Sequence, residues 1–244
     1  MRRIGAEPET AADLAAFIDR QPHLDLEGVF THLAAADDPS ENDFTTGQLA
    51  SFDKAVAAVE QRLGHRPRLV HAANSGGVLA HRAAWHDLIR PGIAAYGYPP
   101  GPGVSGIVPL EPVLSLVSCL SFVKTVRAGQ TVSYGRTWTA DRDTRIGTVP
   151  IGYGDGYSRI LSNRSDILVA GERRPVVGRV CMDQLLVDLG SDSALAAGQP
   201  VTLIGHDGAE RIGADDLGAL IGTISYEVLC AIAARVPRLY TGPA

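Results

Sequence analysis

The sequence has 244 residues, of which 45% are hydrophobic and 20% are charged, and its formal net charge is −5. This composition is typical of a folded globular protein and excludes a disordered or fibrous chain. The negative charge argues against a nucleic-acid or acidic-membrane partner, because phosphate groups bind to basic surfaces. We therefore expect a small-molecule ligand.

The cysteines and the apolar runs argue against metal-binding, membrane and secreted proteins. Cys119, Cys181 and Cys230 occur at spacings that form no metal-ligand pattern, so no metal site is expected. No apolar run approaches the roughly 18 residues that a membrane span requires, and the first residues lack the apolar segment of a signal peptide. The sequence therefore predicts a cytoplasmic protein without membrane contact.

Residues 9–100 alternate between helical and strand-like segments, which is the pattern of β/α units. The apolar spacing predicts a helix over residues 10–20 with Thr10 as its N-cap, and another over 44–63 that ends at Gly64. Strands connected by helices in this way lie parallel in one sheet. The remaining predicted elements are strands at 28–33, 69–73 and 90–97 and a short helix at 78–86.

Three strands cannot close a parallel barrel, which needs eight strands and typically about 250 residues. Unpaired parallel strands would also leave open edges and apolar faces. The sheet is therefore open, or the chain begins inside a larger fold.

The hydrophobic pattern of the sequence changes after the proline- and glycine-rich residues 99–103. The rest of the chain lacks long helical periodicity and is typical of short strands separated by turns. We therefore predict an α/β domain over residues 1–108 and a mostly β domain over residues 109–244. The predicted strands are 113–126, 144–153, 166–170, 175–181, 184–189 and 200–204, the turns are 170–172 and 189–192, and the helices are 212–220 and 225–234.

Two segments near the ends of predicted strands could bind an anion. Asn74 and Ser75 follow one strand, and Arg90 and Gly92 lie in the next. Gly92 permits close backbone approach and Ser75 supplies a hydroxyl, so amide N–H groups there could hold a phosphate. Ordinary turn chemistry accounts equally for these residues, and both interpretations stay open.

Single residues carry weaker signals. His32 ends a predicted strand, where barrels place catalytic groups, although a structural histidine fits the same position. Tyr134 interrupts two β runs and could carry a proton only beside cationic neighbours. Residues 151–157 contain three glycines and two tyrosines, which indicates tight backbone geometry without distinguishing a functional loop from a turn.

Seven sequence blocks together resemble the alanine racemases, in the order and approximate spacing of that family. They extend over nearly the whole chain, which makes a chance match difficult. The blocks are residues 30–32 (FTH), 71–75 (HAANS), 90–97 (RPGIAAYG), 132–135 (VSYG), 151–157 (IGYGDGY), 178–183 (GRVCMD) and 235–240 (RVPRLY).

The resemblance implies the C-terminal part of a (β/α)8 barrel followed by a β domain, with pyridoxal 5'-phosphate (PLP) as cofactor. It makes Tyr134 the base that exchanges the α-proton on the L-face, acting in the active site of the partner subunit of a homodimer. His32 would orient this tyrosine. Arg90 would lie close by and face the ring nitrogen of PLP, where its strongly held proton would keep the ring a weaker electron sink.

The resemblance also assigns the groups that bind the two ligands. The phosphate of PLP would be held by Ser75, the N–H groups of Gly92 and Ile93, and Tyr240, and Asn74 would be a further cofactor-binding residue. The carboxylate of the substrate would meet the N–H of Met182 and the side chain of Arg3. This sequence has Arg2 at the position where the family usually has glycine.

We therefore expect an alanine racemase that interconverts L- and D-alanine for peptidoglycan precursors by a two-base mechanism. In the family the lysine that bonds to PLP lies upstream of the segment matched by Arg3, and neither Lys54 nor Lys124 occupies its position, so these 244 residues alone are expected to be inactive. Two alternatives stay open. One is a related PLP enzyme with another amino-acid substrate, and the other is a non-catalytic dimerising remnant.

Overall fold

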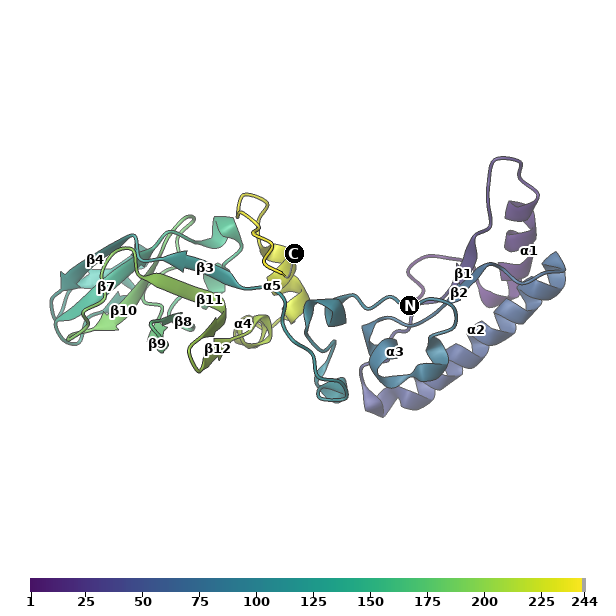
Figure 1. Cartoon of the computed structure of the whole chain (residues 1–244), viewed down its shortest axis with the longest axis horizontal. Helices are drawn as coiled ribbons and strands as arrows, with labels where there is room; N and C mark the ends of the chain where they lie inside the picture. Colours follow the sequence, from purple (N-terminus) through teal and green to yellow (C-terminus); the bar gives the residue numbers. More distant parts are fainter. Residues whose placement is uncertain (243–244) are drawn as a thin grey trace. The chain divides into compact units, whose positions relative to one another are not determined.

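The computed structural model describes residues 1–242 and divides the chain into two compact units, Met1–Glu111 and Pro112–Ala244. The change in sequence pattern predicts this division between residues 108 and 109. The first unit is α/β and the second is mostly β, as the sequence predicts (Figure 1).

Unit 1 is built on one parallel strand pair and two long helices. The helix α1 spans Pro8–Asp19, β1 spans Gly28–Phe30, α2 spans Asn42–Leu63 and β2 spans Leu69–His71. Register places Phe30 opposite His71, so β1 and β2 end at the same edge. Short helices complete the unit: η1 Pro39–Glu41, α3 Ser75–Ala80, η2 Arg82–Ala84, η3 Ile93–Tyr96 and η4 Pro102–Val104.

The helix α2 packs along α1, as Figure 1 shows. Its apolar positions recur at helical spacing and face the core of unit 1. Gly64 ends α2 with φ of 80° and donates its N–H to the carbonyl of Glu60 at 2.9 Å, which confirms the predicted end. The core of unit 1 contains Leu33, Ala36, Leu49, Phe52, Val56, Val70, Ala72, Ala73 and Ala84.

Three predictions for unit 1 are wrong. The helix α1 begins at Pro8 with Glu7 as N-cap, because a proline is favoured in the first turn, and Thr10 lies inside the helix. The predicted helix over 78–86 is instead α3 followed by η2. Residues 90–97 form no strand, because Pro91 has no N–H to donate and the chain turns into η3.

Unit 2 contains antiparallel strands in three sheets. The first sheet has the order β10-β7-β4, with strands Leu185–Gly190, Thr144–Val149 and Phe122–Val126. The second has the order β12-β11-β8-β9, with strands Glu210–Ile212, Pro200–Asp207, Asp166–Val169 and Glu172–Pro175, and β3 (Leu116–Cys119) also pairs with β11. A small sheet joins β5 (Thr131–Val132) to β6 (Trp138–Thr139), and helices η5 Tyr134–Arg136, η6 Tyr153–Asp155, η7 Arg159–Leu161, α4 Ala214–Ile221 and α5 Ser225–Ala231 complete the unit.

The turn predicted at residues 170–172 is a two-residue hairpin between β8 and β9. Ala170 and Gly171 have φ of 54° and 77°, which is the conformation that tight hairpins require. The strand β9 was not predicted, because its sequence is polar. The strand predicted over 175–181 is wrong: Pro175 is the last residue of β9, Val176 forms only an isolated bridge with Val187, and Gly178 with φ of 76° turns the chain away.

One apolar cluster of unit 2 lies next to the β5-β6 sheet. It contains Val126, Val132, Ala140, Ile146 and Val177, with Trp138 and Leu186 packed against it. In the part of the chain that the structure describes, no helix is both long and apolar enough to cross a bilayer.

Candidate active site

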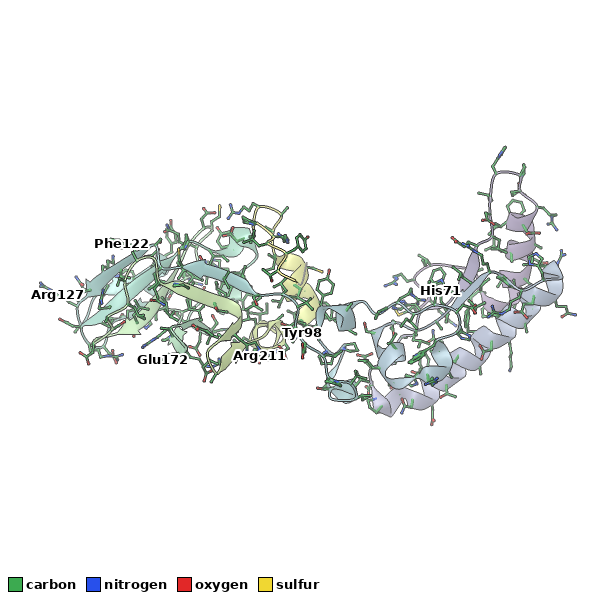
Figure 2. All side chains as sticks on the ribbon, viewed as in Figure 1. His71, Tyr98, Phe122, Arg127, Glu172 and Arg211 are labelled. Atoms are coloured by element: carbon green, nitrogen blue, oxygen red, sulfur yellow. The ribbon has the colours of Figure 1, made fainter. Side chains whose placement is uncertain are left out.

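The carboxyl ends of β1 and β2 surround one arginine. His71 is the last residue of β2, and Figure 2 labels it. The guanidinium of Arg90 donates to Nδ1 of His71. It also donates to the carbonyl oxygens of Thr31 at 2.9 Å and Ala72 at 3.1 Å. The same group lies 5.6 Å from the ring centre of Phe30, which stacks on His71. These contacts fix the charged group in one orientation.

Burial and the charge of Arg90 determine the state of two histidines. Burial first, and then Arg90, lower the pKa of His71 below its ordinary value. The same causes lower the pKa of His32, with further contributions from the exposed Arg3 and the N-terminal amino group. Burial lowers the pKa of Arg90 as well, although a guanidinium keeps its proton in proteins. At neutral pH the cluster is a fixed positive charge beside neutral imidazoles.

A buried hydroxyl lies against the loop that follows Arg90. Ser75 begins α3 and is only 4% exposed, and its Oγ accepts a hydrogen bond from the N–H of Ala94 at 3.3 Å. A hydroxyl that accepts one hydrogen bond in this way can still donate its own proton. A Cβ added at Gly92 would lie 3.9 Å from Ser75 Oγ, with no other neighbour within 4 Å. The structure thus brings together Ser75 and Gly92, and Ile93 follows Gly92 in the chain.

Two further predicted site residues have structural contacts in unit 1. Oδ1 of Asn74 accepts from the N–H of Gly77 at 3.0 Å, and its Nδ2 donates to the carbonyl of Leu33 at 3.1 Å. Oδ1 thus caps α3, Nδ2 ties the cap to the segment after β1, and a cofactor contact of Asn74 stays a prediction. The backbone of His32 is held by Gln48, whose Nε2 donates to its carbonyl at 2.7 Å.

In unit 2, a strained loop presents Tyr134 to solvent. Tyr134 is 74% exposed. Ser133 before it has φ of 63° and ψ of 179°, a combination that is essentially restricted to glycine. Gly135 and Arg136 after it have φ of 72° and 50°. Ser133 Oγ donates to the carbonyl of Arg179 at 2.7 Å and so secures the loop. Strain of this kind costs about 1–3 kcal/mol per residue and is typical of functional sites.

Met182 lies in a turn that packs against the loop of η6. The N–H of Tyr153 donates to the carbonyl of Cys181 at 3.0 Å, and that of Gly154 donates to the carbonyl of Met182 at 2.8 Å. Met182 is 53% exposed. Within residues 1–242, the N–H of Met182 donates to no protein acceptor, and its contact with a substrate carboxylate stays a prediction.

The two tyrosines of residues 151–157 have different environments. Tyr157 is buried, its Oη lies 2.9 Å from Ser165 Oγ, and burial raises its pKa. Tyr153 is at the surface beside the Met182 turn. Tyr157 is therefore a core residue, and only Tyr153 could meet a ligand.

The C-terminal segment of unit 2 carries the last predicted site residue. Arg235 forms ion pairs with Asp155 at 2.7 Å and Asp183 at 2.6 Å, and so links this segment to the Met182 turn. Tyr240 is 95% exposed. In the described part of the chain, no group of three or more His, Cys, Asp or Glu side chains could hold a metal ion.

Comparisons with protein-family models account for both units. The model of the alanine racemase N-terminal domain matches residues 1–100, and that of the alanine racemase C-terminal domain matches residues 113–240. The chain belongs to the alanine racemase family. This finding confirms the resemblance that the seven sequence blocks indicated.

Individual alanine racemases align with almost the whole chain. The protein from Cutibacterium acnes is 48% identical over 242 residues, which are 99% of this chain and 64% of that relative. The Bacillus anthracis enzyme, solved with bound L-Ala-P, has a TM-score of 0.91 and 37% identity, with 99% of this chain and 62% of that chain covered. The Bartonella henselae enzyme, solved with covalently bound pyridoxal phosphate, has a TM-score of 0.82 and 29% identity, with 99% and 64% covered.

The chain thus spans about 64% of the length of the curated alanine racemase from Cutibacterium acnes. Within this span the structure adds one functional candidate that the sequence did not: His71, which accepts from Arg90. Its place within the strand predicted over 69–73, three residues before Asn74, was the available signal.

Proposed function

We propose that this chain carries the part of an alanine racemase active site that binds PLP and provides the L-face base. The proposed reaction is the interconversion of L- and D-alanine, which supplies peptidoglycan precursors. It would take place in a cytoplasmic homodimer. Membership of the alanine racemase family supports this proposal. The structural observation that carries the proposal is the Arg90 guanidinium, fixed by His71 and two carbonyl groups where β1 and β2 end. Strand ends of this kind are where barrel enzymes place their sites.

The residues near α3 fit the phosphate of PLP. The buried Ser75 hydroxyl has a proton to donate, and the space in front of Gly92 would be partly filled by any side chain. Ser75, Gly92 and Ile93 would hold the phosphate, with Asn74 and Tyr240 as further contacts. PLP, when bound, would withdraw electrons from the Cα of the substrate.

Arg90 suits the ring nitrogen of PLP because a guanidinium has only donors and keeps its charge. His71, Thr31 and Ala72 supply the acceptors for its hydrogen bonds. The orientation of the guanidinium is therefore fixed before a ligand binds. Such preorganisation removes the need for reorientation during the reaction.

The proton transfers require a base on each face of the substrate Cα. Tyr134, supplied to the site of the partner subunit, would remove or return the proton on the L-face, and His32 would orient it. The N–H of Met182 and the side chain of Arg3 would bind the substrate carboxylate. The base on the opposite face would be the PLP-bonded lysine that the family resemblance places upstream of the matched segment.

The proposal is tested with a chimaera in which the unmatched N-terminal segment of the Cutibacterium acnes relative precedes this chain. We expect the chimaera with added PLP to convert L-alanine to D-alanine faster than it racemises serine, lysine or arginine. Arg90→Leu should abolish this activity, whereas the 244-residue chain alone should be inactive and should acquire no PLP on Lys54 or Lys124 after borohydride reduction. A folded, PLP-loaded chimaera that racemises another amino acid faster would contradict the proposal.

A further inference from the structure

We propose that Ser133 and Asn163 are positioning residues that hold the loop of Tyr134 and the turn of Met182 in one rigid frame. The catalytic meaning of this inference rests on the proposed function, whereas the frame itself is a property of unit 2. Neither residue belongs to the predicted site.

The first connection is made by Ser133. Its Oγ donates to the carbonyl of Arg179 at 2.7 Å and lies 3.7 Å from Cys181 Sγ. Ser133 immediately precedes Tyr134, and Cys181 immediately precedes Met182. The hydroxyl therefore joins the two segments within one residue of each group that would act on the substrate.

Close packing reinforces this connection. A Cβ added at Gly178 would lie 2.6 Å from the Cβ of Ser133 and 3.2 Å from the carbonyl oxygen of Val132. Only glycine at this position, with its φ of 76°, allows the turn to approach the Tyr134 loop so closely. The unusual backbone of Ser133 is thus stabilised by a hydrogen bond and by contact with the turn.

The second connection is made by Asn163, which lies in neither segment. Its Oδ1 accepts from the N–H of Gly178 at 2.5 Å, and its Nδ2 donates to Thr137 Oγ1 at 3.1 Å. Asn163 has φ of 58°, a conformation that asparagine tolerates better than most residues. One amide thereby links the far end of the Tyr134 loop to the beginning of the Met182 turn.

The neighbouring Ser162 extends the same arrangement. Its Oγ accepts from the N–H of Val180 at 2.9 Å and donates to the carbonyl of Arg159 at 2.6 Å. On the other side of the turn, the N–H groups of Tyr153 and Gly154 hold its two carbonyls. The turn is therefore fixed from both sides, and the Tyr134 loop is attached to a rigid support.

A base must reach its proton within hydrogen-bond distance, and a displacement of about 1 Å can lower the rate by about 100-fold. Tyr134 is exposed and makes no core contact that would hold its backbone by burial. We infer that Ser133 and Asn163 supply this constraint by side-chain hydrogen bonds instead. Loss of either should alter the placement of the phenol more than the stability of unit 2.

Amide hydrogen exchange of the 244-residue chain tests the frame without any activity. Asn163→Ala should increase exchange at the N–H of Gly178 at least 10-fold, and Asn163→Asp, which keeps the acceptor oxygen, should retain most of the protection. The matched control is Ser191→Ala, which removes a hydroxyl that donates to the carbonyl of Asp143 at 2.6 Å elsewhere in unit 2. Unchanged exchange at Gly178 in Asn163→Ala would overturn the frame.

Kinetics of the chimaera test positioning separately. Ser133→Ala should lower kcat for L-alanine about 10-fold or more with little change in KM, and deuterium entry at Cα should fall more from L- than from D-alanine. Ser133→Gly also removes the hydroxyl but relieves the backbone strain. If the hydrogen bond positions Tyr134, this variant should likewise lose more deuterium entry from L- than from D-alanine. Equal loss from both enantiomers would overturn the positioning role. If a folded, PLP-loaded chimaera is inactive, the proposed function fails, and the exchange data still decide the frame.

Discussion

The guanidinium of Arg90 donates to Nδ1 of His71, so this imidazole nitrogen must be unprotonated in the folded chain. Protonation of Nδ1 would set two positive charges against each other in a partly buried place. The pair therefore connects the orientation of Arg90 to the protonation state of His71.

This connection predicts that acid destabilises unit 1. The pKa of His71 is lowered in the folded chain by burial and by Arg90, so the unfolded chain binds a proton first as the pH falls below about 6.5. Stability from this group is complete above pH 6.5 and is lost as the pH falls towards the folded-state pKa. His32 contributes in the same direction, because its pKa is also lowered.

We expect the thermal midpoint to fall between pH 8 and pH 5.5, and to fall less in His71→Gln, whose amide oxygen can still accept from Arg90. The control variant is His23→Gln, since His23 is exposed. Circular dichroism melts at constant ionic strength measure the effect. A pH dependence that is identical in His71→Gln and in the unmodified chain would contradict this account.

Two glycines provide opposite predictions for stability. A Cβ at Gly152 would lie 2.2 Å from the carbonyl oxygen of Cys181 and 2.5 Å from that of Met182, so Gly152→Ala must displace the Met182 turn. We expect a loss of about 1–3 kcal/mol in the free energy of unfolding. Gly47 lies within α2 with nothing near its Cβ position, so Gly47→Ala should add roughly 0.5–1 kcal/mol.

Urea unfolding of both variants, monitored by circular dichroism, measures these changes. Hydrogen exchange provides a local control: Gly152→Ala should weaken the protection of the Tyr153 and Gly154 amides, whereas Gly47→Ala should leave them unchanged. A Gly152→Ala variant as stable as the parent chain would show that the turn is loosely packed.

Ser75 is predicted to bind the cofactor phosphate. In the chimaera, Ser75→Ala removes a hydrogen bond to a charged group, which typically contributes about 1.5–3 kcal/mol, so the dissociation constant of PLP should rise at least about 10-fold. The matched control is Ser121→Ala, whose hydroxyl donates to the carbonyl of Thr148 in unit 2. Titration followed by PLP absorbance measures both, and equal affinity in the two variants would remove Ser75 from the phosphate site.

The parts of the fold that follow local rules were readable in the sequence. The apolar spacing of α2 and the glycine that ends it identified that helix, and residues 170–172 identified the turn that follows β8. Elements that depend on tertiary contacts could not be predicted from the sequence. The polar strand β9 exists because β8 lies beside it. Residues 90–97 have the composition of a strand, but Pro91 lacks an N–H and the chain turns into η3.

The candidate site shows the same division. Family-like blocks identified Arg90, Ser75 and Tyr134 as residues of interest, whereas they did not show which residues support them. The contact of His71 with Arg90 depends on strand register, and the bridge made by Asn163 depends on where two loops meet. The strained backbone of Ser133 is a conformation that no residue pattern reveals, because serine rarely adopts it.

The central claim is that Tyr134 is the base for the L-enantiomer. A phenol that gains and loses one proton in each turnover typically contributes about 100- to 10,000-fold, and Tyr134→Phe removes only the hydroxyl. The measurement is the rate of deuterium incorporation at Cα, followed by NMR in deuterated water with the PLP-loaded Tyr134→Phe chimaera. This rate should fall strongly with L-alanine as substrate. It should be nearly unchanged with D-alanine, because the lysine base still acts. Equal retention of deuterium entry from the two enantiomers would contradict the role of Tyr134.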